Sequence, residues 1–159
     1  MPNWCWNSLT VIGDKEYIDN MAAAFAEGKL LNFIKPVADS EDWYAERVAA
    51  WGTKWDIDGE NASCRVEQGE GDQWIFNASF DSAWAPPVNA YQALVDKGIE
   101  VRAYYYEPGM NFCGMFDSNG DEYYDILGDS EWVVENIPEE IDISMGISES
   151  MEMYEEDEE

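Results

Sequence analysis

The sequence predicts an α+β fold in which strands outnumber helices. Several runs of residues alternate between apolar and polar side chains, as half-buried strands do, and other runs place apolar side chains at helical spacing. The two kinds of run are mixed along the chain. The length of 159 residues fits one domain, and 46% hydrophobic residues supply enough side chains for one core.

The first part of the chain predicts a strand and two helices. Residues 4–13 alternate as a strand, and Asp14 can cap a helix over residues 15–27 that Gly28 ends. The segment that follows contains Pro36 and is predicted to be a loop before a short second helix. The ranges of this loop and this helix are 30–42 and 41–50.

The middle of the chain predicts two hairpins with a helix and a strand between them. Residues 62–67 and 73–80 alternate on either side of a turn that contains two glycines. In the second hairpin, Asn119 and Gly120 form a dipeptide that is typical of a tight turn. The remaining predicted elements are a helix from Trp84 to Gly98, a strand at residues 99–107, and the hairpin strands at 111–116 and 122–126.

The C-terminal residues form an acidic extension. We place the α+β domain at residues 1–128 and the extension at residues 129–159. Trp132 can begin another helix, Pro138 interrupts it, and residues 153–159 are nearly all acidic. Because like charges at this density repel one another, we expect the extension to be partly helical or extended. The last five residues should then contribute to partner binding and not to stability.

The charge of the protein is strongly negative. The chain carries 35 Asp and Glu against 8 Lys and Arg and no His, for a net charge of -27. Arg102 is the last basic residue, so the 18 acids of residues 103–159 are uncompensated. Residues 1–102 hold the other 17 acids and all 8 bases, hence a net charge of -9. A field of this sign repels nucleic acid and anionic membranes, so we expect direct binding to neither.

The sequence offers few residues for catalysis or for a metal ion. It has no His, and its three cysteines are too widely spaced for a disulfide framework or a CxxC metal site. Asp117 and Asp121 alternate as in a calcium loop, but Gly120 comes too early for one. We therefore expect no enzyme activity, no cofactor and no metal site. No signal peptide or membrane span is predicted, so we expect a cytoplasmic protein.

Four short segments form a recognisable set. They are residues 1–5 (MPNWC) with Asn7, residues 51–56 (WGTKWD), residues 80–87 (FDSAWAPP), and an acidic turn at residues 107–109 (EPG) that precedes Phe112 and Gly114. Together and in this order they resemble the YubB-type ferredoxin-like family, a group of small proteins encoded mainly by bacteriophages and plasmids. The resemblance covers about residues 1–126. It implies a ferredoxin-like α+β sandwich with a mixed or antiparallel sheet, here with an additional β-hairpin, and a mobile-element origin, but no biochemical activity.

The tryptophan-rich second segment has two interpretations. Its indoles, with Lys54 to meet a charge, could line a pocket for a planar or anionic ligand. In the structural interpretation the indoles are buried and anchor a loop on the sheet, while Lys54 pairs with Asp56 or Glu107. We favour the structural interpretation because large aromatic side chains usually fill cores. The candidate pocket residues are Trp51, Lys54, Trp55, Asp56 and Trp84.

The acidic C-terminal part also has two interpretations. As a solvated face and tail it would keep the protein soluble. Alternatively, its carboxylates would bind a basic groove of another protein as DNA phosphates do, with electrostatic steering and counterion release. The charge extends through a predicted hairpin and an aromatic-bearing segment, which solubility alone does not require. The candidate partner-binding residues are Asp117, Asp121, Glu122, Asp125, Asp129, Glu131, Glu135, Glu139, Glu140, Glu155, Glu156 and Asp157.

From these observations we predict a phage or mobile-element accessory protein that binds and inhibits a host protein. The partner would belong to a DNA-directed antiphage defence system, of the restriction, BREX or CRISPR type, and would have its basic surface occluded by DNA mimicry. The alternative is a small-ligand-binding or enzymatic domain built on the tryptophan pocket. We also expect a homodimer through Tyr104 and Tyr106, on the outward face of their strand, unless the C-terminal segment folds back over them.

Overall fold

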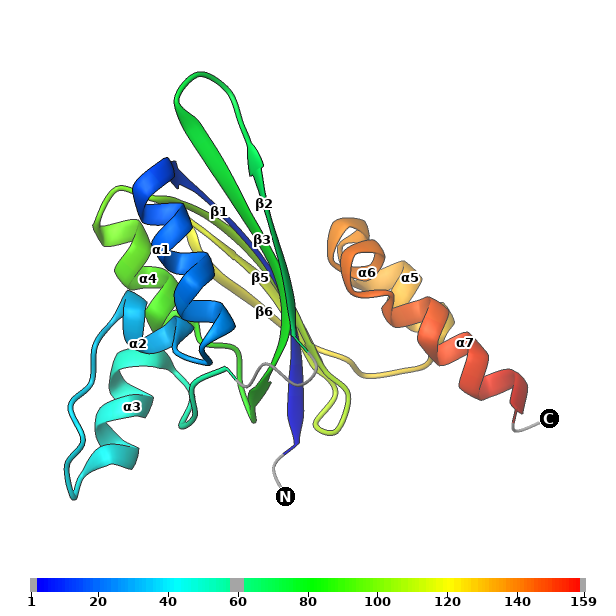
Figure 1. Ribbon diagram of the computed structural model, residues 1–159. Helices are drawn as coiled ribbons and strands as arrows, with labels where there is room; N and C mark the ends of the chain where they lie inside the picture. Colours follow the sequence, from blue (N-terminus) through cyan, green and yellow to red (C-terminus); the bar gives the residue numbers. More distant parts are fainter. Residues whose placement is uncertain (1–2, 58–61, 158–159) are drawn as a thin grey trace.

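The computed structural model describes residues 3–57 and 62–157, which form three layers (Figure 1). A six-stranded sheet lies in the middle, helices α1 to α4 cover one face, and helices α5 to α7 lie on the other. The mixed α+β architecture predicted from the sequence is confirmed. Of the described helices, none has the length and apolar character needed to span a bilayer.

The sheet has the strand order β2-β3-β1-β4-β5-β6, and each neighbouring pair is antiparallel. Strand β1 is central: it pairs with β3 along its whole length and with β4 on its other side. Both predicted hairpins, β2-β3 and β5-β6, are present. The strands are β1 Trp4–Asp14, β2 Ser63–Gln68, β3 Gln73–Ala83, β4 Glu100–Glu107, β5 Phe112–Asp117 and β6 Gly120–Asp125.

Two of the helices, α1 and α5, begin at an acidic cap. Asp14 caps α1 as predicted, because its side chain accepts a hydrogen bond of 2.8 Å from the N–H of Tyr17. Asp129 caps α5 in the same way. The helices are α1 Lys15–Ala26, α2 Leu30–Ile34, α3 Trp43–Trp51, α4 Val88–Asp96, α5 Ser130–Asn136, α6 Glu139–Met145 and α7 Ile147–Asp157.

The loop predicted at residues 30–42 is wrong in its first part, where α2 lies. The carboxylate of Asp56 accepts hydrogen bonds from the N–H groups of Leu31 (2.8 Å) and Asn32 (3.0 Å). These bonds satisfy donors that the first turn of a helix leaves without a partner. The cap of α2 therefore comes from a residue beyond the next helix, and the local sequence pattern does not contain it.

The main core lies between the sheet and helices α1 to α4. Alternate residues of β1, β3 and β4 point into it, as the period-two pattern predicts. Helices α1 and α4 contribute side chains at helical spacing. Buried members of this core include Leu9, Val11, Ile18, Phe76, Leu94 and Val101.

A second apolar core lies on the opposite face of the sheet. Tyr106 of β4 and Cys113 of β5 pack there with the C-terminal helices, whose buried side chains include Val133 and Ile141. Helix α6 contacts β1, β4 and β5, and α7 packs on α5 and α6. The chain from Ser130 to Asp157 is therefore a folded helical layer and not an extended tail.

This layer corrects the expected dimer surface. Tyr106 was expected to be exposed, but its side chain is 4% exposed because the C-terminal helices cover it. Tyr104 is half-buried against the same cluster. The face that we expected to bind a second copy is occupied by the chain's own helices.

Gly114 allows a tyrosine to reach across strand β5. Tyr105 of β4 lies opposite Gly114, and its hydroxyl donates a hydrogen bond of 2.6 Å to Asp121 in β6. A Cβ atom on Gly114 would collide with the Tyr105 hydroxyl and with the carbonyl oxygen of Glu122. Burial and the bonded carboxylate raise the pKa of Tyr105 well above its usual range, so the hydroxyl stays a donor.

We predict that Gly114→Ala lowers the free energy of unfolding by about 1–3 kcal/mol, since overpacking a core has this typical cost. Gly13→Ala in β1 is the matched control: its Cβ would meet nothing closer than Ile18, at 3.7 Å. It should change stability by less than about 1 kcal/mol. Urea unfolding followed by tryptophan fluorescence measures both variants, and equal losses would contradict the prediction.

Candidate functional site

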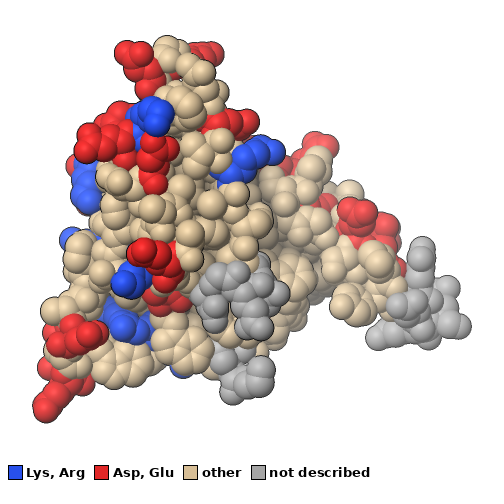
Figure 2. All heavy atoms as spheres, in the orientation of Figure 1, with Lys and Arg blue, Asp and Glu red and all other residues tan. Residues whose placement is uncertain are grey.

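Most candidate partner-binding acids are exposed and lie on β6 and the C-terminal helices. Figure 2 shows those acids of the C-terminal helices that face the viewer, at the right of the view. The ion pairs found among the described residues are Lys15 with Asp19 and Arg65 with Glu67, and both lie elsewhere in the fold. The described carboxylates of this part therefore have no cationic partner among the described residues. We call the following exposed residues the acidic surface: Asp121, Glu122, Asp125, Asp129, Glu131, Glu135, Glu139, Glu140 and Glu155.

Asp117 does not belong to this surface, and the side-chain positions of two further candidate acids are not described. Asp117 is half-buried and accepts a hydrogen bond of 2.8 Å from the N–H of Asn119 within the hairpin turn. The side chains of Glu156 and Asp157 lie outside the described part of the chain. The hairpin turn thus accounts for Asp117 without any ligand.

Two acids of the surface also hold the C-terminal helices together. Asp129 accepts a hydrogen bond of 3.1 Å from the N–H of Trp132. Glu155 of α7 reaches α5 and accepts bonds from the N–H (3.0 Å) and the hydroxyl (2.7 Å) of Ser130. Glu155 therefore ties α7 to the first turn of α5, which argues against the expectation that the acidic end does not contribute to stability.

Apolar side chains are exposed among these acids. Ile143 of α6 is 71% exposed and Tyr154 of α7 is 72% exposed, and Val134 of α5 and Met153 of α7 are exposed as well. Exposed apolar groups rimmed by polar ones are typical of surfaces that bind another macromolecule. A surface kept only for solubility gains nothing from them.

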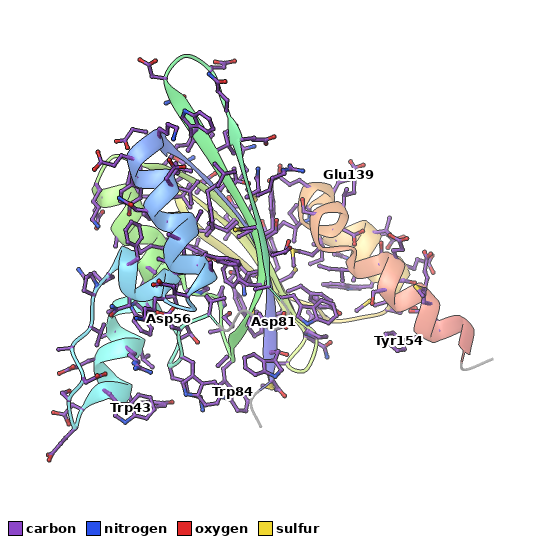
Figure 3. The ribbon with its side chains drawn as sticks, in the orientation of Figure 1. Trp43, Asp56, Asp81, Trp84, Glu139 and Tyr154 are labelled. Carbon is purple, nitrogen blue, oxygen red and sulfur yellow. The ribbon has the colours of Figure 1, made fainter. Side chains whose placement is uncertain are left out.

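A groove of about 430 Å³ lies between the end of the sheet and α7. One wall is aromatic, with the rings of Trp6 and Tyr106 edge to face at 5.4 Å between centroids. Figure 3 shows Tyr154 on α7, the helix that forms the other wall. The sequence analysis missed this groove, although the alternation of the first strand put Trp6 on the face away from the main core. The residues that line the groove include Trp6, Tyr106, Asp129, Met151, Tyr154 and Glu155.

The tryptophans of the candidate pocket differ in burial. Trp51 is buried, at 2% exposure, and donates its indole N–H to the carbonyl oxygen of Lys35 at 2.8 Å. Trp55 and Trp84 are 38% and 46% exposed, and Trp84 lies at the lower end of the view in Figure 3. The structural interpretation, in which all three indoles are buried, is therefore right for Trp51 and wrong for the other two.

Lys54 does not pair with either of the expected acids. Its ammonium lies over the ring of Trp55, 4.3 Å from the centroid, as a cation–π contact. Asp56 caps α2, and Glu107 is buried and accepts hydrogen bonds from the N–H groups of Gly109 (2.6 Å) and Met110 (2.8 Å). Both carboxylates are used by backbone donors, so the predicted ion pair is wrong.

The four segments that carry the family resemblance meet at one end of the sheet. The Thr53 hydroxyl donates to the carbonyl oxygen of Ala83 at 2.8 Å, which joins the second segment to the third. The N–H of Trp84 donates to the carbonyl oxygen of Asn3 at 2.8 Å, which joins the third to the first. Trp84 has φ of 70°, an uncommon conformation for a bulky residue. A Cβ on Gly109 of the fourth segment would collide with Asn3.

The buried thiols are poor nucleophiles. Burial raises the pKa of Cys113 to about 12 and that of Cys5 further, so both stay protonated at neutral pH. Within residues 3–57 and 62–157, no three Cys, Asp or Glu side chains are grouped so as to hold a metal ion. The acidic surface and the groove offer charge and aromatic side chains for contact.

Comparisons of the chain with protein-family models, curated proteins and solved structures find no match. The family resemblance therefore stays a prediction. The function has to be argued from the acidic surface, the exposed apolar side chains among its acids, and the groove beside it.

We predict that Glu155→Ala lowers the free energy of unfolding by about 1–3 kcal/mol, because it leaves the buried Ser130 N–H without a partner. Glu152→Ala is the matched control, since Glu152 is exposed on the same helix and accepts no hydrogen bond among those found. Each variant loses one negative charge on α7 and gains an alanine, so charge and helix propensity change equally in both. Thermal unfolding followed by circular dichroism measures both, and equal melting temperatures would refute the tie between α7 and α5.

We predict that the protein becomes more stable as the pH falls from 7 to about 5. Burial raises the pKa of the carboxyls of Asp56, Asp81 and Asp121. The carboxyls therefore become protonated at a higher pH in the folded state than in the unfolded chain, where their pKa is about 4. The free energy of unfolding therefore rises as the pH falls through the raised values, and the smaller net negative charge acts in the same direction. A melting temperature that falls over this pH range at constant salt would contradict the prediction.

Proposed function

We propose that the protein is a phage or mobile-element accessory protein that acts in the host cytoplasm by binding and inhibiting a host protein. Its target is a component of a DNA-directed defence system, of the restriction, BREX or CRISPR type, with a basic surface that handles nucleic acid. The acidic surface covers that basic surface and excludes DNA. One observation carries the proposal: the uncompensated acids lie on a folded helical layer, interspersed with exposed apolar side chains.

Solubility alone does not explain this layer. A solubilising tail needs charge but no fixed shape, and like charges at this density favour an extended chain. Here the acidic helices are held in place by an apolar core and by Glu155 and Asp142, whose carboxylates bond to Ser130 and Ser148. A fixed array of carboxylates is the form that complements a fixed array of basic side chains.

Two further observations support the mobile-element part of the proposal. The order β2-β3-β1-β4 with α1 and α4 on one face supports the proposal of a ferredoxin-like sandwich, to which β5 and β6 would add a hairpin. The four segments that resemble the YubB-type family also meet at one end of the sheet through the bonds of Thr53 and Trp84. Because the four segments contact one another, they form one cluster in the fold, as one structural motif would.

The mechanism is electrostatic occlusion. The negative field steers the protein to a basic surface, and binding releases the anions that surround that surface, as binding to DNA does. The exposed apolar side chains then contribute contacts that a phosphate backbone lacks. The protein can therefore compete with a stretch of DNA that carries the same charge. The affinity for the target should therefore fall steeply as the salt concentration rises.

The test removes charge from the acidic surface and follows displacement of labelled duplex DNA from purified restriction, BREX and CRISPR complexes. The wild type should displace DNA from at least one of these complexes. A variant with four Glu→Gln substitutions on α5 and α6 should need roughly tenfold more protein or greater, because each exposed charge contributes a few tenths of a kcal/mol or more. The substituted residues are Glu131, Glu135, Glu139 and Glu140, of which Glu139 is labelled in Figure 3.

The control variant also loses four negative charges, but at other positions in the fold. Its substitutions lie on exposed residues of α1, the loop before α3 and the β2-β3 turn, outside the acidic surface. It should displace DNA as the wild type does. Equal weakening in both variants would show that only net charge matters, and failure of the wild type on every complex would refute the proposed targets. The control residues are Glu16, Glu27, Glu41 and Glu70.

A further inference from the structure

The groove beside α7 has walls that favour a flat cation. Trp6 and Tyr106 line one side, and Tyr154 lines the other. Trp6 is 38% exposed although it contacts Tyr106, so part of its indole is open to a ligand. The faces of aromatic rings attract a cation placed over them, and tryptophan attracts it most strongly.

The end of the groove at α5 carries excess negative charge. Asp129 and Glu155 both line the groove, and both accept hydrogen bonds from the first turn of α5. The N-terminus of a helix offers the equivalent of roughly half a positive charge, so two carboxylates leave a surplus of more than one negative charge. Each carboxylate has about four acceptor sites and uses only one or two of them here, so both can accept further donors.

No cation from residues 3–57 or 62–157 is found over the aromatic rings of this groove. Within the described residues, the cations that lie over aromatic rings belong to Lys15, Arg47 and Lys54, and their ring partners are outside the groove. The chain contains no basic residue after Arg102. The groove therefore combines aromatic walls and surplus charge that nothing within the described chain neutralises.

We propose that the groove binds one arginine side chain of the partner protein, with the guanidinium between Trp6 and Tyr154 and its N–H groups bonded to Asp129 and Glu155. The inference rests on the proposed function, because it assumes a basic protein partner. Arginine fits better than lysine because its planar group stacks on aromatic rings and presents five donors in a fixed fork. The volume of about 430 Å³ is within the range of roughly 300–1,000 Å³ that ligand sites occupy.

This contact would fix the orientation of the partner on the acidic surface. Charges on an exposed surface attract a partner from a distance but leave its position loosely defined, since each pair contributes little. A desolvated arginine in an aromatic pocket is a typical interface hot spot. The acidic surface would then set the rate of association, and the groove would set the lifetime of the complex.

The test uses a capped pentapeptide with one central arginine between glycine and serine residues, titrated into the full-length protein. Proton–nitrogen NMR spectra follow the indole N–H of Trp6, which is assigned by its loss in Trp6→Leu. We expect this signal to shift in a saturable way. An otherwise identical peptide with citrulline, which has the same shape without the charge, should leave the signal in place.

Variants separate the groove from general attraction by the negative charge. Tyr154→Leu should weaken peptide binding roughly 3- to 10-fold, as loss of a cation–π contact does. Its matched control is Tyr44→Leu, which removes an exposed tyrosine from α3, far from the groove in the fold. Glu155→Gln should weaken binding, and Glu152→Gln on the same helix should not. Melting temperatures confirm that each variant is folded.

Three results would overturn the inference. They are an indole signal that does not move with the arginine peptide, an equal response to the citrulline peptide, and equal weakening by Tyr154→Leu and Tyr44→Leu. The outcome is separable from that of the DNA displacement test. If the four Glu→Gln substitutions abolish displacement while Tyr154→Leu changes neither displacement nor peptide binding, the proposed function stands and the arginine site is refuted.

Discussion

The contact between the second face of the sheet and helices α5 to α7 governs the rest of this structure. Both faces of the sheet carry apolar side chains, and on the second face Tyr106 and Cys113 need a cover. The residues that supply it, such as Ile141 and Ile147, come from the part of the chain with the highest density of acids. Burial of these side chains offsets the repulsion among the acids, and the acids are left facing outward.

Backbone N–H groups take the role that basic side chains play in most proteins. With 8 cations for 35 acids, few carboxylates can form ion pairs. Asp14, Asp129 and Asp142 instead accept hydrogen bonds at helix starts, and Asp56 and Glu107 do so for α2 and a turn. Charge-assisted bonds of this kind are stronger than neutral ones, which explains how a chain of this charge keeps short helices in place.

The arrangement of layers also creates the functional surfaces. Since α7 packs on α5 and α6 more than on the sheet, a groove remains between it and the strand ends, with Trp6 and Tyr106 on one side. The same layering places the carboxylates on a rigid support. The proposed inhibition of a basic host surface therefore depends on the second core as much as on the charge.

The sequence by itself determined the local elements and the charge. Strand β1, the Asp14 cap of α1 and both hairpins follow from periodicity and turn residues, which act within a few positions. Only the tertiary structure decided which faces are covered. Helix α2 needs a cap from Asp56, Tyr106 is buried by helices that follow much later in the chain, and the groove needs two layers. These features depend on contacts between distant segments, and local patterns carry no information about them.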